Sequence, residues 1–133
     1  MSVTTYDPQD VNVVVNGTII TGFMDGTFIN VERDEESFFV HVGAKGEVTR
    51  TVNANKLGRI TITLKQDSPS NSFLSRLANS KETFPVSVVD QNFNTNAGGN
   101  DAWVERPANL EYAKELTSRQ WIIVVPELDM VEG

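Results

Sequence analysis

The side chains of this chain that could do chemistry are one histidine and a few clustered carboxylates. His41 is the only histidine and lies between Val40 and Val42 in an alternating segment. A histidine-dependent nucleophile or a metal site requires partners at a defined geometry, and no sequence signature nearby supplies one. We therefore interpret His41 as a structural or surface residue.

Carboxylate pairs offer a second route to chemistry, because two carboxyl groups can divide into an acid and a base. Glu35 stands next to Glu36, and Asp25 precedes Glu32 on the same stretch of chain. Glycosidase chemistry requires a cleft that places both groups across a scissile bond, which proximity in sequence does not provide. A contiguous acidic run is typical of a solvated turn rather than a metal site. We predict no enzyme, no catalytic residue, no cofactor and no metal.

The composition is that of an ordinary acidic globular protein. The chain has 133 residues, a formal net charge of −7, 39% hydrophobic residues and no cysteine. This length suffices for one domain, predicted to span residues 1–133, with a core that needs no disulfide. The lack of cysteine excludes a disulfide scaffold, a zinc ribbon and thiol catalysis. The acidity argues against tight binding to a phosphate backbone.

No targeting or membrane segment is expected. The start of the chain contains neither a basic nor a long apolar stretch, and no later segment approaches the length of a transmembrane helix. The chain is therefore expected in the cytoplasm, or in a particle assembled there.

Period-two alternation of apolar and polar residues dominates the chain and predicts a mainly β fold. Asn16-Gly17, between a valine-rich and an isoleucine-rich run, is a strong hairpin signal, because both positions tolerate the positive φ of a type I′ turn. The second half of the alternating strand pattern begins with residues 84–90. The strands are predicted at residues 11–15, 18–23, 27–33, 37–42, 47–52, 59–66, 102–106 and 118–125.

One segment changes to helical spacing and predicts a single short helix. Ser68 or Ser70 can cap its first turn, and Pro69 is tolerated near a helix start. Four apolar residues then fall on one face: Phe73, Leu74, Leu77 and Ala78.

Two segments have the composition of loops. Residues 43–58 are rich in glycine and asparagine and should project as a long hairpin or loop. Residues 91–101 contain several asparagines and a Gly-Gly pair. Residues 111–116 fit either a strand or a helical turn.

The final strand is apolar on both faces over residues 121–125. A half-solvated strand avoids this pattern, so either the domain's own helix or a neighbouring subunit must cover it. The large aromatic residues are expected in the core, with a subunit interface as the alternative for some: Phe38, Phe39, Phe73, Trp103 and Trp121. These observations favour assembly over catalysis.

Turn and strand motifs recur in a specific order along the whole chain. They begin with Tyr6-Asp7-Pro8 and the Val15-Asn16-Gly17 hairpin, and continue through residues 20–23, 25–27, 31–33, 42–43, 46–48, 58–64, 68–71 and 128–130. In this order and spacing the chain resembles a family of small virion proteins from contractile-tailed phages, related in fold to tail tube proteins.

The resemblance implies a small β-barrel or sandwich with one short α-helix, as in tail tube proteins and the related type VI secretion tube proteins. Such subunits join their sheets edge to edge in six-membered rings, which stack into a hollow tube. The chain would then belong to the virion, in the phage tail, and would be assembled in the host cytoplasm. Its partners would be further copies of itself and the sheath, baseplate and terminator proteins. DNA would pass without specific binding, and no membrane would be involved.

Two groups of residues are candidates for roles in such a tube. The loop that reaches the adjacent ring would include Gly43, Ala44, Lys45, Gly46, Asn53, Asn55 and Lys56. The polar rows that face the bore would be Glu47, Thr49 and Thr51 on one strand, and Arg59, Thr61 and Thr63 on another. Acidic or neutral side chains there would repel phosphates, so that DNA slides.

Two other functions remain open at this point. One is a β-sandwich adhesion or decoration module on the virion, which binds a carbohydrate or a neighbouring virion protein. The other is a small hydrolase that uses the carboxylates, for which the site geometry is missing.

Overall fold

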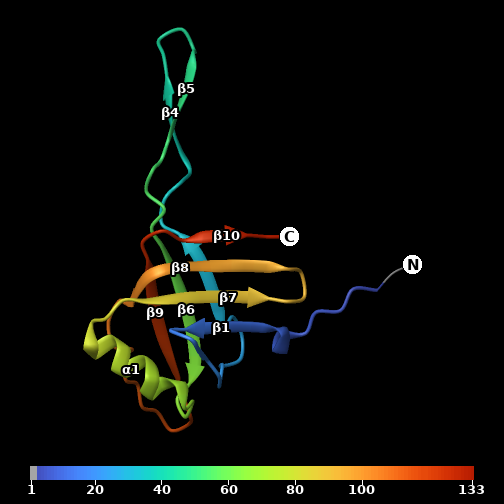
Figure 1. The fold of residues 1–133 in the computed structure, drawn as a ribbon, viewed down its shortest axis with the longest axis vertical. Helices are drawn as coiled ribbons and strands as arrows, with labels where there is room; N and C mark the ends of the chain where they lie inside the picture. The colour runs from blue at the N-terminus through green and yellow to red at the C-terminus, as the bar shows by residue number, and fades with distance from the viewer. Residues whose placement is uncertain (1–2) are drawn as a thin grey trace.

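The computed structural model describes residues 3–133 as an antiparallel sheet with one α-helix and a projecting hairpin (Figure 1). The prediction of a mainly β fold with one short helix is confirmed. The elements in chain order are η1 (Pro8–Asp10), β1 (Val11–Val15), β2 (Thr18–Ile19), β3 (Ile29–Arg33), β4 (Phe38–Val42), β5 (Val48–Val52), β6 (Gly58–Lys65), α1 (Ser70–Ser80), β7 (Phe84–Asp90), β8 (Thr95–Val104), β9 (Ser118–Val125) and β10 (Asp129–Val131).

Eight of the strands form one sheet in the order β2-β1-β7-β8-β9-β6-β3, with β10 also paired to β8. The long strand β8 joins the two halves of this sheet: residues 95–102 pair with β7, whereas Trp103 and Val104 pair with β9. Regular pairing does not close the sheet. An isolated bridge between Phe23 and Leu64 connects the chain after β2 to β6, so the two halves enclose one core.

The alternation of β6 explains which side chains fill this core. Ile60, Ile62 and Leu64 are fully buried, whereas Thr61 and Thr63 between them are partly exposed, as expected for a strand with one buried face. The helix adds its predicted apolar face to the same core: Phe73, Leu74, Leu77 and Ala78.

The start of the helix is tied to the segment that follows β2. Pro69 occupies the N-cap position, and Oγ of Ser68 accepts the Ser70 amide at 3.2 Å, so one of the two predicted capping serines does accept a first-turn amide. Oγ of Ser70 instead accepts the Thr21 amide at 3.0 Å, and the Ser68 hydroxyl donates to the Thr21 carbonyl oxygen at 2.6 Å. These bonds fix the segment around Thr21 against the helix.

Strands β4 and β5 leave the body as a hairpin that forms a separate two-stranded sheet (Figure 1). At its base the Asp34 amide donates to the Leu57 carbonyl oxygen at 2.9 Å, and the Asn53 amide donates to that of Ser37 at 2.8 Å. We call residues 34–57 the arm. It extends beyond the projecting segment predicted at residues 43–58, because β4 belongs to the hairpin and not to the body.

The prediction of a loop at residues 91–101 holds for the turn at residues 91–94 but is wrong from Thr95 on, where β8 begins. The Gly-Gly pair allows close packing of strands: a Cβ on Gly98 would collide with the Val86 carbonyl oxygen, and one on Gly99 would lie 2.6 Å from that of Glu127. Glycine in a strand often marks such a close backbone approach.

Other predicted segments also differ from the structure. The return strand at residues 18–23 is limited to Thr18–Ile19. The Ile20 amide still donates to the Val13 carbonyl oxygen of β1, and the chain then crosses to β6 at Phe23. The strand predicted at 27–33 begins at Ile29. Residues 111–116 form neither a strand nor a helical turn.

The chain itself covers the inner face of strand β9 and Val124 on its outer face, whereas Ile122 on the outer face is only partly buried. Trp121, Ile123 and Val125 point into the core. On the opposite face Val124 is 4% exposed, because Arg59 and Trp103 stand directly beside it on the two neighbouring strands. A larger uncovered apolar surface therefore has to be sought elsewhere on the molecule.

Candidate assembly surfaces

The arm has two chemically different faces, which follow from the pairing register of β4 and β5. Residues directly opposite each other in an antiparallel pair share a face. One face carries the pairs Phe38 with Val52, Val40 with Arg50, and Val42 with Val48. The other face carries the pairs Phe39 with Thr51 and His41 with Thr49. We call these the apolar face and the polar face of the arm.

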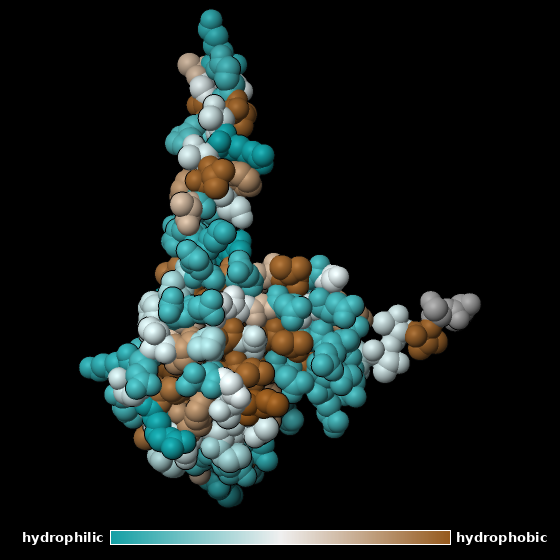
Figure 2. Space-filling view, in the orientation of Figure 1, coloured by the Kyte–Doolittle hydropathy of each residue, from teal (hydrophilic) through white to brown (hydrophobic). Residues whose placement is uncertain are grey.

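The apolar face is uncovered in the single chain. Val40 is 63% exposed, Val42 67%, Val48 69% and Val52 71%, and Figure 2 shows apolar side chains in the middle part of the projecting arm, among hydrophilic ones. An isolated two-stranded hairpin is at best marginally stable in water, and contiguous exposed apolar surface marks an interaction site. The arm therefore has the properties of an element that is stabilised by a partner.

Arg50 is the only charged residue of the paired strands on the apolar face. Its guanidinium carbon lies 4.2 Å from the centre of the Phe38 ring, a cation–π distance. The aliphatic part of the arginine covers apolar surface while the charge stays accessible. A partner of this face should therefore offer apolar contacts and an acidic group.

The polar face carries one of the two rows predicted to face a bore, namely Glu47, Thr49 and Thr51. Thr49 and Thr51 are exposed on β5. The Glu47 carboxylate folds back over the tip, where its Oε2 accepts the Lys45 amide at 3.3 Å. His41 is exposed on the same face, in agreement with its interpretation as a surface residue.

The residues predicted to contact an adjacent ring divide between the two ends of the arm. Gly43, Ala44, Lys45 and Gly46 form the tip turn. Asn53, Asn55 and Lys56 lie at the base instead. There Nδ2 of Asn53 donates to the Glu36 carbonyl oxygen at 2.8 Å, and Nδ2 of Asn55 donates to the Glu35 carboxylate. Glu35 and Glu36 thus contribute to the structure of the arm base.

Thr61, Thr63 and Arg59, the other predicted row, lie on the body. They occupy the outward face of β6, beside Asn30 and Glu32 of β3. Arg59 binds the Asp34 carboxylate and lies 4.0 Å from that of Glu105. The hydrogen bond and charge of Asp34 raise the pKa of Arg59 above its ordinary value, so Arg59 stays charged, and its charge is neutralised within an acidic group.

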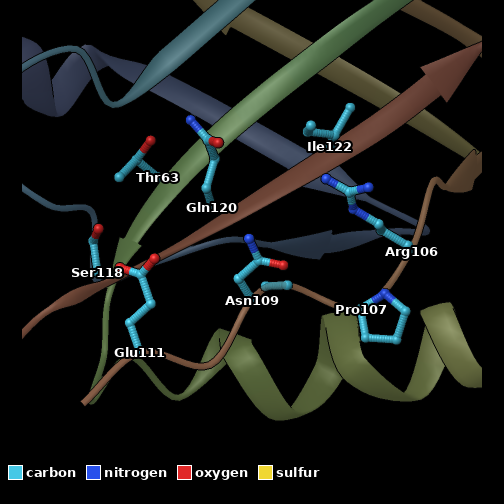
Figure 3. Close-up of a pocket in the computed structure, with 9 residues that line it drawn as sticks. Thr63, Arg106, Pro107, Asn109, Glu111, Ser118, Gln120 and Ile122 are labelled. Carbon is cyan, nitrogen blue, oxygen red and sulfur yellow. The ribbon is translucent and has the colours of Figure 1, made fainter.

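A shallow hollow lies over the same outward face, between strands β6 and β9 and the segment that follows β8 (Figure 3). Its volume is about 230 Å³, and its lining includes Thr63, Gln120, Arg106 and Glu111. Its lining contains a single carboxylate, that of Glu111, and not the carboxylate pair that a hydrolase would need. The carboxylates considered from the sequence, at residues 25, 32, 35 and 36, do not line it.

Within residues 3–133 no group of three or more histidine, cysteine or acidic side chains could hold a metal ion. No helix in the same part of the chain is long and apolar enough to cross a membrane.

The aromatic residues divide between core and surface. Trp121 is buried and Phe73 packs against the core, whereas Phe39 is 48% exposed on the arm and Trp103 is 36% exposed. The segment between β8 and β9 carries an exposed apolar group that was not predicted from the sequence: Leu110, Tyr112 and Leu116. These residues show no periodicity, so only the structure reveals them.

A β fold with an uncovered apolar hairpin and no catalytic constellation in its described part is typical of a subunit that assembles with others. The chain belongs to the family described as Bacteriophage PhiTE tail tube protein, which matches residues 4–133. The resemblance to tail tube proteins inferred from the sequence is therefore confirmed.

One curated relative is similar to this chain in sequence, and two solved structures are similar to it in fold. The relative is Structural protein ORF10 of Pseudomonas phage KPP10, 27% identical over 142 residues that cover 97% of this chain and 82% of the relative. The sheath/tube terminator of PVC, an extracellular contractile injection system, is similar in fold, with TM-score 0.69, 11% identity and coverage of 98% and 99%. The PVC sheath-tube complex matches with TM-score 0.65, 9% identity and coverage of 97% and 93%. The chain is thus a member of a phage tail tube family, and the two solved structures share its fold.

Proposed function

We propose that this chain is the subunit of a phage tail tube, and that its copies form stacked, hexameric rings around a conduit for DNA. The observation that carries the proposal is the uncovered apolar face of the arm in a chain of the tail tube family. The arm projects from one end of the body, so it can reach a copy in the next ring. Residues 1–133 act as a single unit in this proposal, without an enzymatic role.

Within a ring, sheets join edge to edge. Strands β2 and β3 end the paired order of the sheet, and β10 lies outside it on β8. Such edges carry unpaired backbone N–H and C=O groups that can pair with another chain. Because the contacting edges differ, the contact is head-to-tail and closes by rotation into a ring.

The outward face of β6 is proposed to line the bore. This half of the sheet contains four strands, β3, β6, β9 and β8. If each of six copies contributes four strands, the ring contains about 24 strands. At ~4.8 Å spacing and ~40° tilt these strands form a closed barrel with a backbone diameter of about 48 Å. After subtraction of roughly 5 Å of side chain per wall, the bore is wider than duplex DNA.

The charge of this face suits a conduit. Glu32, Asp34 and Glu105 surround Arg59, so the group around Arg59 is net acidic, and the hollow over the same face adds Arg106 and Glu111, one charge of each sign. An acidic wall repels phosphates and lets DNA pass without binding. The polar face of the arm, with Glu47, Thr49 and Thr51, is proposed to face the same bore.

The proposed partners are further copies of the chain and the sheath, baseplate and terminator proteins of the tail. The proposed location is the phage tail, after assembly in the host cytoplasm. Sedimentation velocity and negative-stain electron microscopy of the full chain over a concentration series test the proposal. Rings or tubes of uniform width support it. A folded monomer at every concentration contradicts it and favours an adhesion or decoration module.

A further inference from the structure

We propose that the apolar face of the arm docks into one particular groove on the next copy of the chain, formed by η1, β1 and residues 20–28. This inference rests on the proposed stacking and names the surface that receives the arm. The groove has a volume of about 560 Å³ and is lined by both polar and apolar residues. Its partly exposed apolar residues include Val11, Phe23, Met24 and Phe28.

The groove is preorganised by contacts within its own chain. The Thr21 backbone is held by Ser68 and Ser70 at the helix start. The Met24 amide donates to the Thr63 carbonyl oxygen at 3.0 Å, and the rings of Phe23 and Phe28 lie 5.1 Å apart. A rigid receptor reduces the entropy lost on docking.

The arm and the groove lie toward opposite ends of the body. Strand β6 starts at Gly58, directly after the arm, and Phe23 bridges Leu64 near its other end. The eight residues of β6 separate the two surfaces by about 25 Å. In Figure 1 the arm rises from the top of the body, whereas the blue segment after β1 lies in its lower half. A contact between such surfaces is head-to-tail and repeats from copy to copy along an axis.

The charges of the two surfaces are complementary. Residues 38–52 contain Lys45, Arg50 and Glu47 and carry a net charge of +1. The whole chain carries −7, so the rest of the chain carries −8. Among the described residues, those lining the groove include Asp25 and no lysine or arginine. Arg50, which lies on the apolar face, therefore finds an acidic group where Val40 and Val42 find apolar contacts. Opposite charges across a contact fix its register.

Cysteine cross-linking tests this contact directly, because the chain has no cysteine of its own. Val40→Cys on the apolar face and Thr21→Cys in the groove are prepared as separate full-length chains, mixed, and treated with a short bis-maleimide. The expected result is a covalent dimer in the mixture and none in either chain alone. The double variant should give a ladder, because the contact repeats.

Thr49→Cys is the matched control, since it lies on the polar face of the same hairpin. Mixed with Thr21→Cys, it should give far less dimer. Equal dimer yields from Val40→Cys and Thr49→Cys would overturn the proposal. Cross-linking of Val40→Cys to itself would also overturn it, because the arms would then pair with each other. Tubes without any cross-link would overturn the docking site and leave the proposed function intact, whereas the absence of both rings and cross-links would overturn both.

A charge exchange gives an independent readout. Arg50→Glu and Asp25→Arg should each raise the concentration needed for assembly by about fivefold, the effect of an exposed ion pair worth about 1 kcal/mol. The double variant should restore assembly. Lys81→Glu, an equal charge change at the exposed end of the helix, should leave it unchanged. A double variant that assembles worse than both single variants would contradict the assigned pairing.

Discussion

Arg33 donates two hydrogen bonds to the carbonyl oxygen of Leu128, from Nε at 3.0 Å and from Nη2 at 2.8 Å. The Leu128 amide in turn donates to the Lys56 carbonyl oxygen at 3.0 Å. One buried residue near the C-terminus therefore binds both chain segments at the root of the arm. This arrangement fixes the direction in which the arm leaves the body.

Arg33→Ala should destabilise the fold by about 1–3 kcal/mol, because it leaves the Leu128 carbonyl oxygen without its charged donor. Urea unfolding followed by circular dichroism measures the change. Arg76→Ala, an exposed substitution on α1, is the matched control and should shift stability by less than about 0.5 kcal/mol. Equal effects of the two substitutions would show that the Arg33 contacts contribute little.

Gly58→Ala should also destabilise the root of the arm, by about 1–3 kcal/mol from overpacking. A Cβ on Gly58 would collide with the Leu128 side chain and lie 2.7 Å from the Glu32 carbonyl oxygen. Thermal unfolding measures the effect. At Gly43 the nearest atom is the flexible carboxylate of Glu47, so Gly43→Ala should be tolerated, and a greater loss there than at Gly58 would refute this explanation.

Much of the fold follows from the sequence because alternation directly encodes a buried face. Ile60, Ile62 and Leu64 were identifiable in this way, as was the helical stripe that contains Leu74 and Leu77. That Gly98 and Gly99 lie in a strand could not be predicted from the sequence, because glycine occurs both in loops and in closely packed strands. Only the position of Val86 and its neighbours distinguishes the two cases.

The apolar face of the arm could be predicted less well from the sequence, for a related reason. Alternation in Phe38, Val40 and Val42 predicts an apolar face but does not say what covers it. The same pattern describes a core strand and an uncovered hairpin, so β4 could be assigned to the arm only from the structure. For β9 the opposite holds: its two apolar faces suggested a missing partner, yet Trp103 and Arg59 of the same chain cover Val124.

Removal of the hairpin should separate folding from assembly. Ser37 and Asn53 are already joined by a backbone hydrogen bond of 2.8 Å, so an Asn-Gly turn can replace residues 38–52. Circular dichroism and urea unfolding should show an intact body, and electron microscopy should show no stacked rings. An unfolded product would mean that the arm is part of the folding unit, and normal stacking would mean that the arm has no role in assembly.

Asn71→Ala should loosen the attachment of the helix to the sheet. Oδ1 of Asn71 accepts Nε1 of Trp121 at 3.0 Å, and its Nδ2 donates to the carbonyl oxygens of Lys65 and Gln66. Loss of the acceptor leaves the indole N–H unpaired in a buried position, at a cost of about 1–3 kcal/mol. Urea unfolding followed by tryptophan fluorescence tests this, with the exposed Asn79→Ala as control. A loss at Asn79 as large as that at Asn71 would contradict it.

A cryo-electron microscopy reconstruction of the assembled full chain would show directly whether the copies form a tube. We expect a hollow tube of stacked rings, with Arg59, Thr61 and Thr63 on the wall of the bore and each arm in contact with the next ring. A particle without a bore, or rings whose arms contact no other copy, would contradict this proposal.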